Sequence, residues 1–115
     1  TITAARAYGL DVLDGVYNNF KDTEGYVREC VHGRHLGFDG KTLIHPDQVA
    51  KANEIFAPPP AEVAFALKIV AAFDLPENKG KGVITVDGRM VELLHAEMAR
   101  RTLAIATAIE KMGAA

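Results

Sequence analysis

Three consecutive prolines, Pro58 to Pro60, interrupt the chain near its middle. Proline fixes its own backbone angle φ and has no N–H to donate, so a run of three can continue neither a helix nor a central strand. Because no regular element can pass through this point, we predict a domain boundary here. Residues 1–57 form the first part and residues 58–115 the second.

The residues before the prolines alternate between strand-like and helix-like segments. The pattern predicts a strand over residues 9–20, a helix between Asp22 as N-cap and Gly33 as C-cap, a short strand within residues 36–44, and a helix that starts at Pro46. Strands that alternate with helices pair in parallel and need cover on both faces, which two strands cannot obtain alone. Either the chain dimerises extensively or these are the last two units of a larger parallel barrel or sheet, and we favour the second interpretation.

The residues behind the prolines predict a mainly helical segment. An amphipathic helix comes first, followed by a polar loop over residues 74–82, a β-like run over residues 83–86 and a turn at Asp87-Gly88. A long helix is then predicted over residues 91–112. Its apolar residues share one side at helical spacing, where they can pack internally or against a partner: Leu94, Met98, Ile105, Ile109 and Met112.

Charge and composition narrow the classes of function. The 13 basic residues are scattered among 15 acidic ones and tryptophan is absent, which argues against a nucleic-acid partner because such a surface needs concentrated positive charge. No apolar stretch reaches the roughly 18 to 20 residues of a membrane span, so we expect no membrane partner. Cys30 is the only cysteine, which favours a reducing cytoplasm. The chain starts at Thr1 in what reads as the end of a helix, so we expect an upstream portion to be missing.

Three stretches resemble one protein family. Residues 37–46, GFDGKTLIHP, resemble the signature at the last barrel strand of the malyl-CoA lyase and citrate lyase beta-subunit superfamily, which is HpcH/HpaI aldolase-like. Residues 9–17, GLDVLDGVY, resemble its penultimate strand, and residues 86–92, VDGRMVE, resemble its C-terminal lid. The resemblance covers essentially the whole chain and is nearest to malyl-CoA lyases, and residues 40–46 are its most specific part.

The resemblance implies an α/β fold that is part of a (β/α)8 barrel. Residues 1–57 would be the last two β/α units of the barrel, and residues 58–115 a C-terminal helical lid and oligomerisation extension. Lids of this family close the active site of a neighbouring subunit. A homo-oligomer that exchanges lids between subunits is therefore expected.

The resemblance also implies an activity. Malyl-CoA lyases are carbon–carbon lyases that cleave a CoA thioester reversibly to acetyl-CoA and the 2-oxo acid glyoxylate by retro-Claisen chemistry. Their cofactor is Mg²⁺, whose ligands come from middle strands of the barrel that would lie upstream of this segment. We therefore assign no metal ligand here, and we expect the segment alone to be inactive.

A catalytic carboxylate is implied for the lid, and two acids can supply it. They are Asp87 in the predicted turn and Glu92 at the start of the long helix, and we favour Asp87. The reaction needs a group that moves a proton to or from the reacting atoms, which a carboxylate can do. Without the resemblance, Asp87 is a turn residue and Glu92 is an acid that the helix dipole favours.

Four residues near the ends of the two predicted strands are candidates for substrate binding. Ile44 and His45 end the second strand, at the face where barrel active sites form, next to the start of a helix that can hold the pantetheine or phosphate part of CoA. Lys41 either contacts a phosphate or is solvated, and Asp14 either lines the pocket or has a turn or packing role. His45 can equally be a structural residue at the helix start.

Other interpretations remain open. Within the same scaffold the parent enzyme can be a malyl-CoA thioesterase, a citramalyl-CoA lyase or a citrate lyase beta subunit. Outside enzymes, the segment can be a non-catalytic lid or oligomerisation module whose long helix docks on a neighbour. It can also be a complete small domain.

Overall fold

The computed structural model describes residues 1–114, which are mostly helical with four short strands. They divide into two compact units, Thr1–Phe56 and Ala57–Ala115, and each is described by itself. Within residues 1–114 no single helix is long and apolar enough to cross a membrane, although the helical stretches Pro46–Phe56 and Pro60–Asp74 meet that test of length and composition when taken together.

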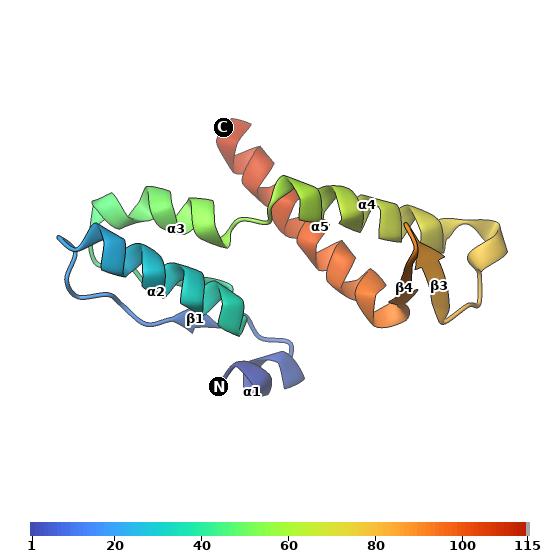
Figure 1. Cartoon of the computed structure of the whole chain (residues 1–115), viewed down its shortest axis with the longest axis horizontal. Coiled ribbons are helices and arrows are strands. Elements are labelled where there is room, and N and C mark those ends of the chain that lie inside the picture. Colours follow the sequence, from blue (N-terminus) through green and yellow to red (C-terminus); the bar gives the residue numbers. More distant parts are fainter. Residues whose placement is uncertain (115) are drawn as a thin grey trace. The chain divides into compact units, whose positions relative to one another are not determined.

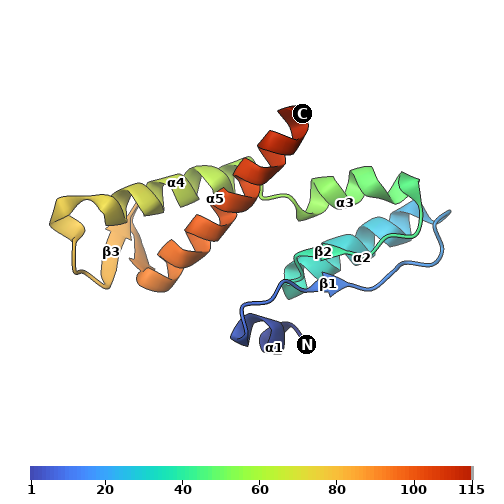
Figure 2. The ribbon, with the colours of Figure 1, turned by 180° about the vertical axis from the view of Figure 1, so that it is seen from behind.

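The first unit contains two β/α repeats behind a short helix (Figure 1). Strands β1 and β2 pair in parallel, with Leu13 opposite Gly40 and Asp14 opposite Lys41, and Figure 2 shows them side by side along α2. The order strand, helix, strand, helix agrees with the predicted α/β pattern. The elements are α1 (Ile2–Ala7), β1 (Leu13–Asp14), α2 (Thr23–Leu36), β2 (Gly40–Lys41), a 3-10 turn (Pro46–Gln48) and α3 (Val49–Phe56).

The predicted strand over residues 9–20 is wrong in its extent. Only Leu13 and Asp14 form β1, because β2 offers just two residues for the parallel ladder. Gly9, with φ at 67°, turns the chain before the strand, and Gly15 follows it with its N–H directed at the Asp14 carboxylate. Propensity for β structure could not reveal how short the paired segment is.

Helix α2 begins as predicted and ends later than predicted. The Asp22 carboxylate accepts a hydrogen bond from the Gly25 N–H at 3.0 Å, which confirms the N-cap. The expected C-cap at Gly33 is wrong, because the helix continues to Leu36 and Gly37 adopts the left-handed conformation, with φ at 108°. Gly33 instead leaves room inside the fold, since a Cβ there would lie 2.9 Å from Oδ2 of Asp14.

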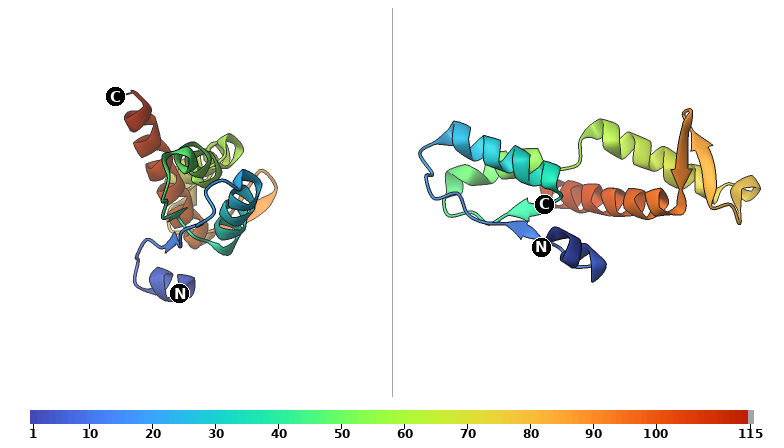
Figure 3. Two further views of the ribbon diagram at one scale, coloured as in Figure 1. Left: turned by 90° about the vertical axis from the view of Figure 1, so that its left-hand side faces the viewer. Right: turned by 60° about the horizontal axis from the view of Figure 1, so that its bottom comes forward.

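The second unit packs two helices against a β-hairpin. Its elements are α4 (Pro60–Asp74), a 3-10 turn (Pro76–Asn78), β3 (Val83–Val86), β4 (Arg89–Glu92) and α5 (Leu93–Ala114). The right panel of Figure 3 shows α4 and α5 running side by side with the hairpin at one end. One buried cluster joins the two helices and the two strands: Ala66, Ile69, Phe73, Ile84, Val86, Val91, Ala96 and Ala99.

The long helix starts two residues later than predicted. Residues 89–92, partly assigned to that helix, form β4 and pair antiparallel with β3. The turn between the strands has φ of 49° at Asp87 and 77° at Gly88, which are the positive angles of a two-residue hairpin turn, so the predicted turn is confirmed. The turn directs the chain back, and Val91 is buried opposite Ile84.

The apolar stripe predicted on the long helix is not the face that packs inside the unit. Ala96 and Ala99 are buried instead, because small side chains allow α4 and α5 to approach closely. The stripe residues are exposed or half-exposed, with Met98 at 58% and Met112 at 77%. This outcome favours the alternative that the stripe contacts a partner.

Candidate active site

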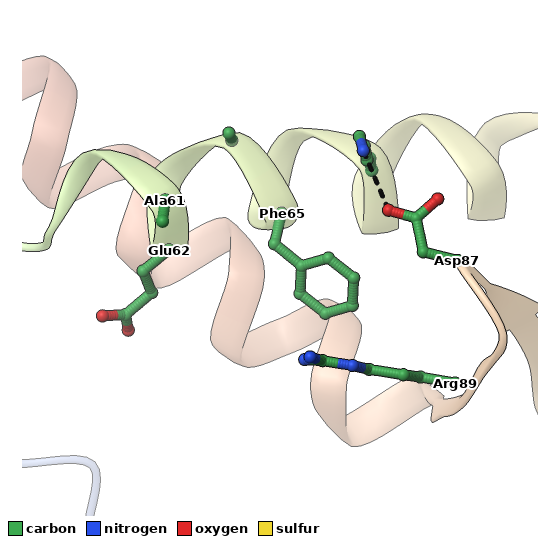
Figure 4. A pocket seen from close by; sticks show the side chains of 7 residues that line it. Ala61, Glu62, Phe65, Asp87 and Arg89 are labelled. Atoms are coloured by element: carbon green, nitrogen blue, oxygen red, sulfur yellow. Dashed lines mark hydrogen bonds and ion pairs between the residues drawn. The ribbon is translucent and has the colours of Figure 1, made fainter.

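Asp87 lies on the rim of an open groove in the second unit (Figure 4). Its carboxylate accepts a hydrogen bond from the Lys68 ammonium, with 2.8 Å between Nζ and Oδ2. Both side chains are more than half exposed, at 59% for Lys68 and 54% for Asp87. The groove has a volume of about 640 Å³ and is lined by Ala61, Glu62, Ala64, Phe65, Lys68, Asp87 and Arg89.

The hairpin turn explains how Asp87 reaches this position. Aspartate is one of the few residues besides glycine and asparagine that tolerate a positive φ, and the following Gly88 completes the turn. Two buried residues, Val86 and Val91, hold the hairpin against α4 and α5. The carboxylate is therefore carried on a short, well-supported turn and remains accessible to solvent.

Arg89 forms the other side of the groove. Its guanidinium carbon lies 5.2 Å from the centre of the Phe65 ring, which is cation–π distance. Figure 4 shows the side chain extended alongside that ring. Neither residue was singled out in the sequence, where Arg89 is only the residue after a turn and Phe65 one apolar position of a helix.

Glu92, the other candidate acid, lies apart from this groove. It ends β4 opposite Val83, and its side chain is not part of the groove lining. Its backbone N–H donates to Nδ1 of His95 at 2.8 Å, so His95 caps the start of α5. The structure thus separates Asp87 and Glu92 and gives only Asp87 a cationic partner and a cavity.

Lys41 and Asp14 come together in the first unit, but inside the fold. The Lys41 side chain has no exposed surface, and its ammonium lies 2.6 Å from Oε2 of Glu29 and 3.1 Å from Oδ2 of Asp14. Burial by itself would lower the pKa of Lys41, but the hydrogen bonds to Glu29 and Asp14 outweigh it and raise the pKa above its ordinary value. The expectation of a solvated Lys41 is therefore wrong, since the side chain joins the strands to α2.

Ile44 and His45 occupy the loop after β2. The Ile44 N–H donates to Oε1 of Gln48 at 3.1 Å, and Nδ1 of His45 accepts from the Asp47 N–H at 3.1 Å. The His45 ring also stacks on Phe20, with 4.6 Å between ring centres and 2° between planes. These contacts give His45 the capping role that the sequence left open, while substrate binding by Ile44 and His45 remains a prediction.

A buried amide organises this loop and was missed from the sequence. Gln48 is 2% exposed, and its Nε2 donates to the Tyr17 carbonyl at 3.2 Å. The Tyr26 hydroxyl donates to the Gln48 carbonyl at 2.7 Å. Gln48 lies two residues after the recognised residues 40–46, in the stretch that resembles the family, but no role was predicted for it.

The described residues of this chain do not form a metal site. Among residues 1–114, the structure brings together no group of three or more histidine, cysteine, aspartate or glutamate side chains that could hold a metal ion. Asp14 and Glu29, two acids that lie near each other, are both bound to Lys41. An ammonium between two carboxylates takes the place that a cation would need.

Two solved structures share the fold of this chain. A citrate lyase from Burkholderia xenovorans LB400 superposes with a TM-score of 0.72 at 21% identity, over 95% of this chain and 33% of that one, a likeness of fold alone. Protein CitE from Mycobacterium tuberculosis was solved in complex with magnesium, acetoacetate and coenzyme A. It superposes with a TM-score of 0.61 at 30% identity, over 89% of this chain and 38% of that one.

Sequence comparison leads to the particular family. Residues 1–46 match the model of the HpcH/HpaI aldolase/citrate lyase family. The (3S)-malyl-CoA thioesterase of Cereibacter sphaeroides strain ATCC 17025 is 56% identical over 98% of this chain and 40% of its own length. Human mitochondrial citramalyl-CoA lyase is 36% identical over 96% of this chain and 32% of its own length. Citrate lyase subunit beta of Leuconostoc mesenteroides subsp. cremoris is 40% identical over 91% of this chain and 35% of its own length.

Residues 1–46 belong to the HpcH/HpaI aldolase/citrate lyase family, and the whole chain is similar to the thioesterase and the two lyases. The chain spans about two fifths of the length of the thioesterase relative and about a third of the length of each of the two lyases. The expected resemblance is therefore confirmed at the level of the family.

Proposed function

We propose that this chain is part of an enzyme that acts on a malyl-CoA-type thioester, with Asp87 as a proton-transferring group. The observation that carries the proposal is 56% identity to a (3S)-malyl-CoA thioesterase over 98% of the chain. The geometry supports it, because Asp87 is a solvent-accessible carboxylate on the rim of a groove and is oriented by Lys68. We propose also that residues 1–56 belong to a (β/α)8 barrel and that the full protein is a cytoplasmic homo-oligomer.

Hydrolysis is the reaction we propose first, because of that thioesterase relative. Water adds to the thioester carbonyl, the carbon–sulfur bond breaks, and malate and CoA leave. Asp87 would accept the proton of the attacking water, and that proton would pass to the departing thiolate. The Lys68 ammonium, 2.8 Å from Asp87, holds the carboxylate in place on the rim of the groove.

Carbon–carbon cleavage, the reaction expected from the sequence, is the second candidate. The relatives named citramalyl-CoA lyase and citrate lyase subunit beta favour it. The hydroxyl of the malyl group loses its proton, the neighbouring carbon–carbon bond breaks, and glyoxylate and the acetyl-CoA enolate form. The enolate carbon then takes up a proton, and Asp87 would be the group that moves it.

Magnesium is part of this proposal only for the full protein. The M. tuberculosis CitE structure holds magnesium. The described residues of this chain do not fit such a site, and we expect the ligands elsewhere in the protein.

Product analysis with matched variants tests the proposal in the full-length protein. Malyl-CoA should give either malate and CoA or acetyl-CoA and glyoxylate, which chromatography distinguishes. Asp87→Asn, which keeps the turn because asparagine also tolerates a positive φ, should lower kcat by about 100-fold or more. Glu92→Gln is the control and should change kcat by less than about threefold. Unchanged turnover in Asp87→Asn would support the non-catalytic lid module instead.

A further inference from the structure

The groove beside Asp87 contains a cation that the proposed chemistry does not use. Arg89 is exposed, and its guanidinium lies over the face of Phe65. No carboxylate pairs with it there, whereas Lys68 on the same groove is paired with Asp87. A guanidinium stacked on an aromatic ring keeps its N–H groups in the plane of the fork, where they can donate outward.

We propose that Arg89, supported by Phe65, binds an oxyanion of the substrate in this groove, either a phosphate of the CoA moiety or the free carboxylate of the acyl group. The inference rests on the proposed function for the identity of the substrate. Both anions accept two parallel hydrogen bonds from one guanidinium. The groove, at about 640 Å³, is large enough for a substrate-sized group beside Asp87.

The arrangement of charges decides where the anion lies. The Lys68 ammonium, 2.8 Å from Asp87, offsets the repulsion that the Asp87 carboxylate would exert on an incoming anion. Glu62 is the other acid of the lining, and Figure 4 shows its carboxylate at the far side of Phe65 from Asp87. An anion held by Arg89 is therefore attracted by Arg89 and weakly repelled by Glu62.

The ring beneath Arg89 limits the loss of freedom on binding. A long arginine side chain that is mobile must be ordered before it can donate two hydrogen bonds, which costs conformational entropy. Contact with Phe65 at 5.2 Å restricts the guanidinium before the ligand arrives. The pair thus provides a planar, partly ordered donor at one side of the groove.

Calorimetric titration of the full-length protein with non-reacting probes tests the proposal. The probes are CoA, 3′-dephospho-CoA and L-malate. Arg89→Gln should weaken binding of at least one probe by about tenfold, and Arg89→Lys should restore only part of it because lysine cannot donate in a fork. Arg100→Gln, an exposed arginine of α5 outside the groove, is the control for net charge.

The probes identify the anion and separate this inference from the proposed function. A loss for CoA that is absent for 3′-dephospho-CoA assigns the 3′-phosphate, a loss for both assigns the diphosphate, and a loss for L-malate assigns the acyl carboxylate. The inference is wrong if Arg89→Gln and Arg100→Gln behave alike or if the unaltered protein binds no probe. If malyl-CoA is not turned over but Arg89→Gln still weakens CoA binding, the reaction is wrong and the oxyanion site stands.

Discussion

The ammonium of Lys41 in β2 lies 2.6 Å from the carboxylate of Glu29 in α2, and the Lys41 side chain is fully buried. The same ammonium reaches Asp14 of β1 at 3.1 Å. A single cation therefore ties both parallel strands to the helix that connects them. Its position explains why a lysine in the recognised stretch 40–46 is structural in this unit.

Replacing Lys41 tests that tie. Lys41→Met should destabilise the protein by about 2 kcal/mol, because it leaves Asp14 and Glu29 facing each other without a cation. The value is below that of a fully buried pair because both carboxylates keep some exposure, 24% and 41%. Urea denaturation measures the change. Lys51→Met is the control, since the exposed Lys51–Glu54 pair should contribute less than about 0.5 kcal/mol.

The stabilisation by the Lys41 network should depend on pH in the alkaline range. The pKa of Lys41 is higher in the folded state than its ordinary value of about 10.4, so the folded state binds the proton more tightly. Its contribution is complete below about pH 10.4 and is lost as the pH rises through the folded pKa. The difference in free energy of unfolding between the unaltered protein and Lys41→Met should therefore narrow above about pH 10.4. A difference that stays constant through that range would contradict the assignment.

Replacing Gly25 by alanine should destabilise the protein, whereas the same change at an ordinary helical glycine stabilises it. A Cβ at Gly25 would lie too close to the Asp22 carboxylate and the Tyr17 hydroxyl, and moving these side chains aside would break the hydrogen bonds that Asp22 accepts from Gly25 and Tyr17, so Gly25→Ala should destabilise the protein by about 1 kcal/mol. Gly113 in α5 has open space around it, and Gly113→Ala should be neutral or stabilising by up to about 1 kcal/mol. Thermal denaturation of the two variants gives the comparison, and equal signs would refute the collision.

The contribution of Asp22 to the stability of the fold should depend on pH in the acidic range. The hydrogen bond from the Gly25 N–H, followed by that from the Tyr17 hydroxyl, lowers the pKa of Asp22. A lowered folded pKa means that the stabilisation is present above the unfolded value of about 3.9 and disappears as the pH falls through the folded pKa. Asp22→Asn keeps a capping side chain but removes the charge. The free energy of unfolding of Asp22→Asn should therefore fall less steeply than that of the unaltered protein as the pH is lowered from 6 to about 2.

Local chemistry was sufficient to predict several elements. The helix cap at Asp22, the break at Pro58 and Pro59, and the hairpin turn at Asp87-Gly88 all depend on residues within a few positions of each other. The alternation of strand and helix before the prolines was also readable, because each segment carries its own periodicity. The resemblance at residues 37–46 pointed to the family that comparison then confirmed.

The sequence by itself thus predicted the alternation of strand and helix before the prolines, the hairpin turn at Asp87-Gly88 and the family. Only the tertiary structure decided the lengths of β1 and β2, the burial of Lys41 between Asp14 and Glu29, and the groove that joins Lys68 to Asp87. These features depend on residues 12 to 27 positions apart, whose approach depends on how whole elements pack. Propensity and spacing describe a segment and its near neighbours, so they cannot specify which charges meet across a fold.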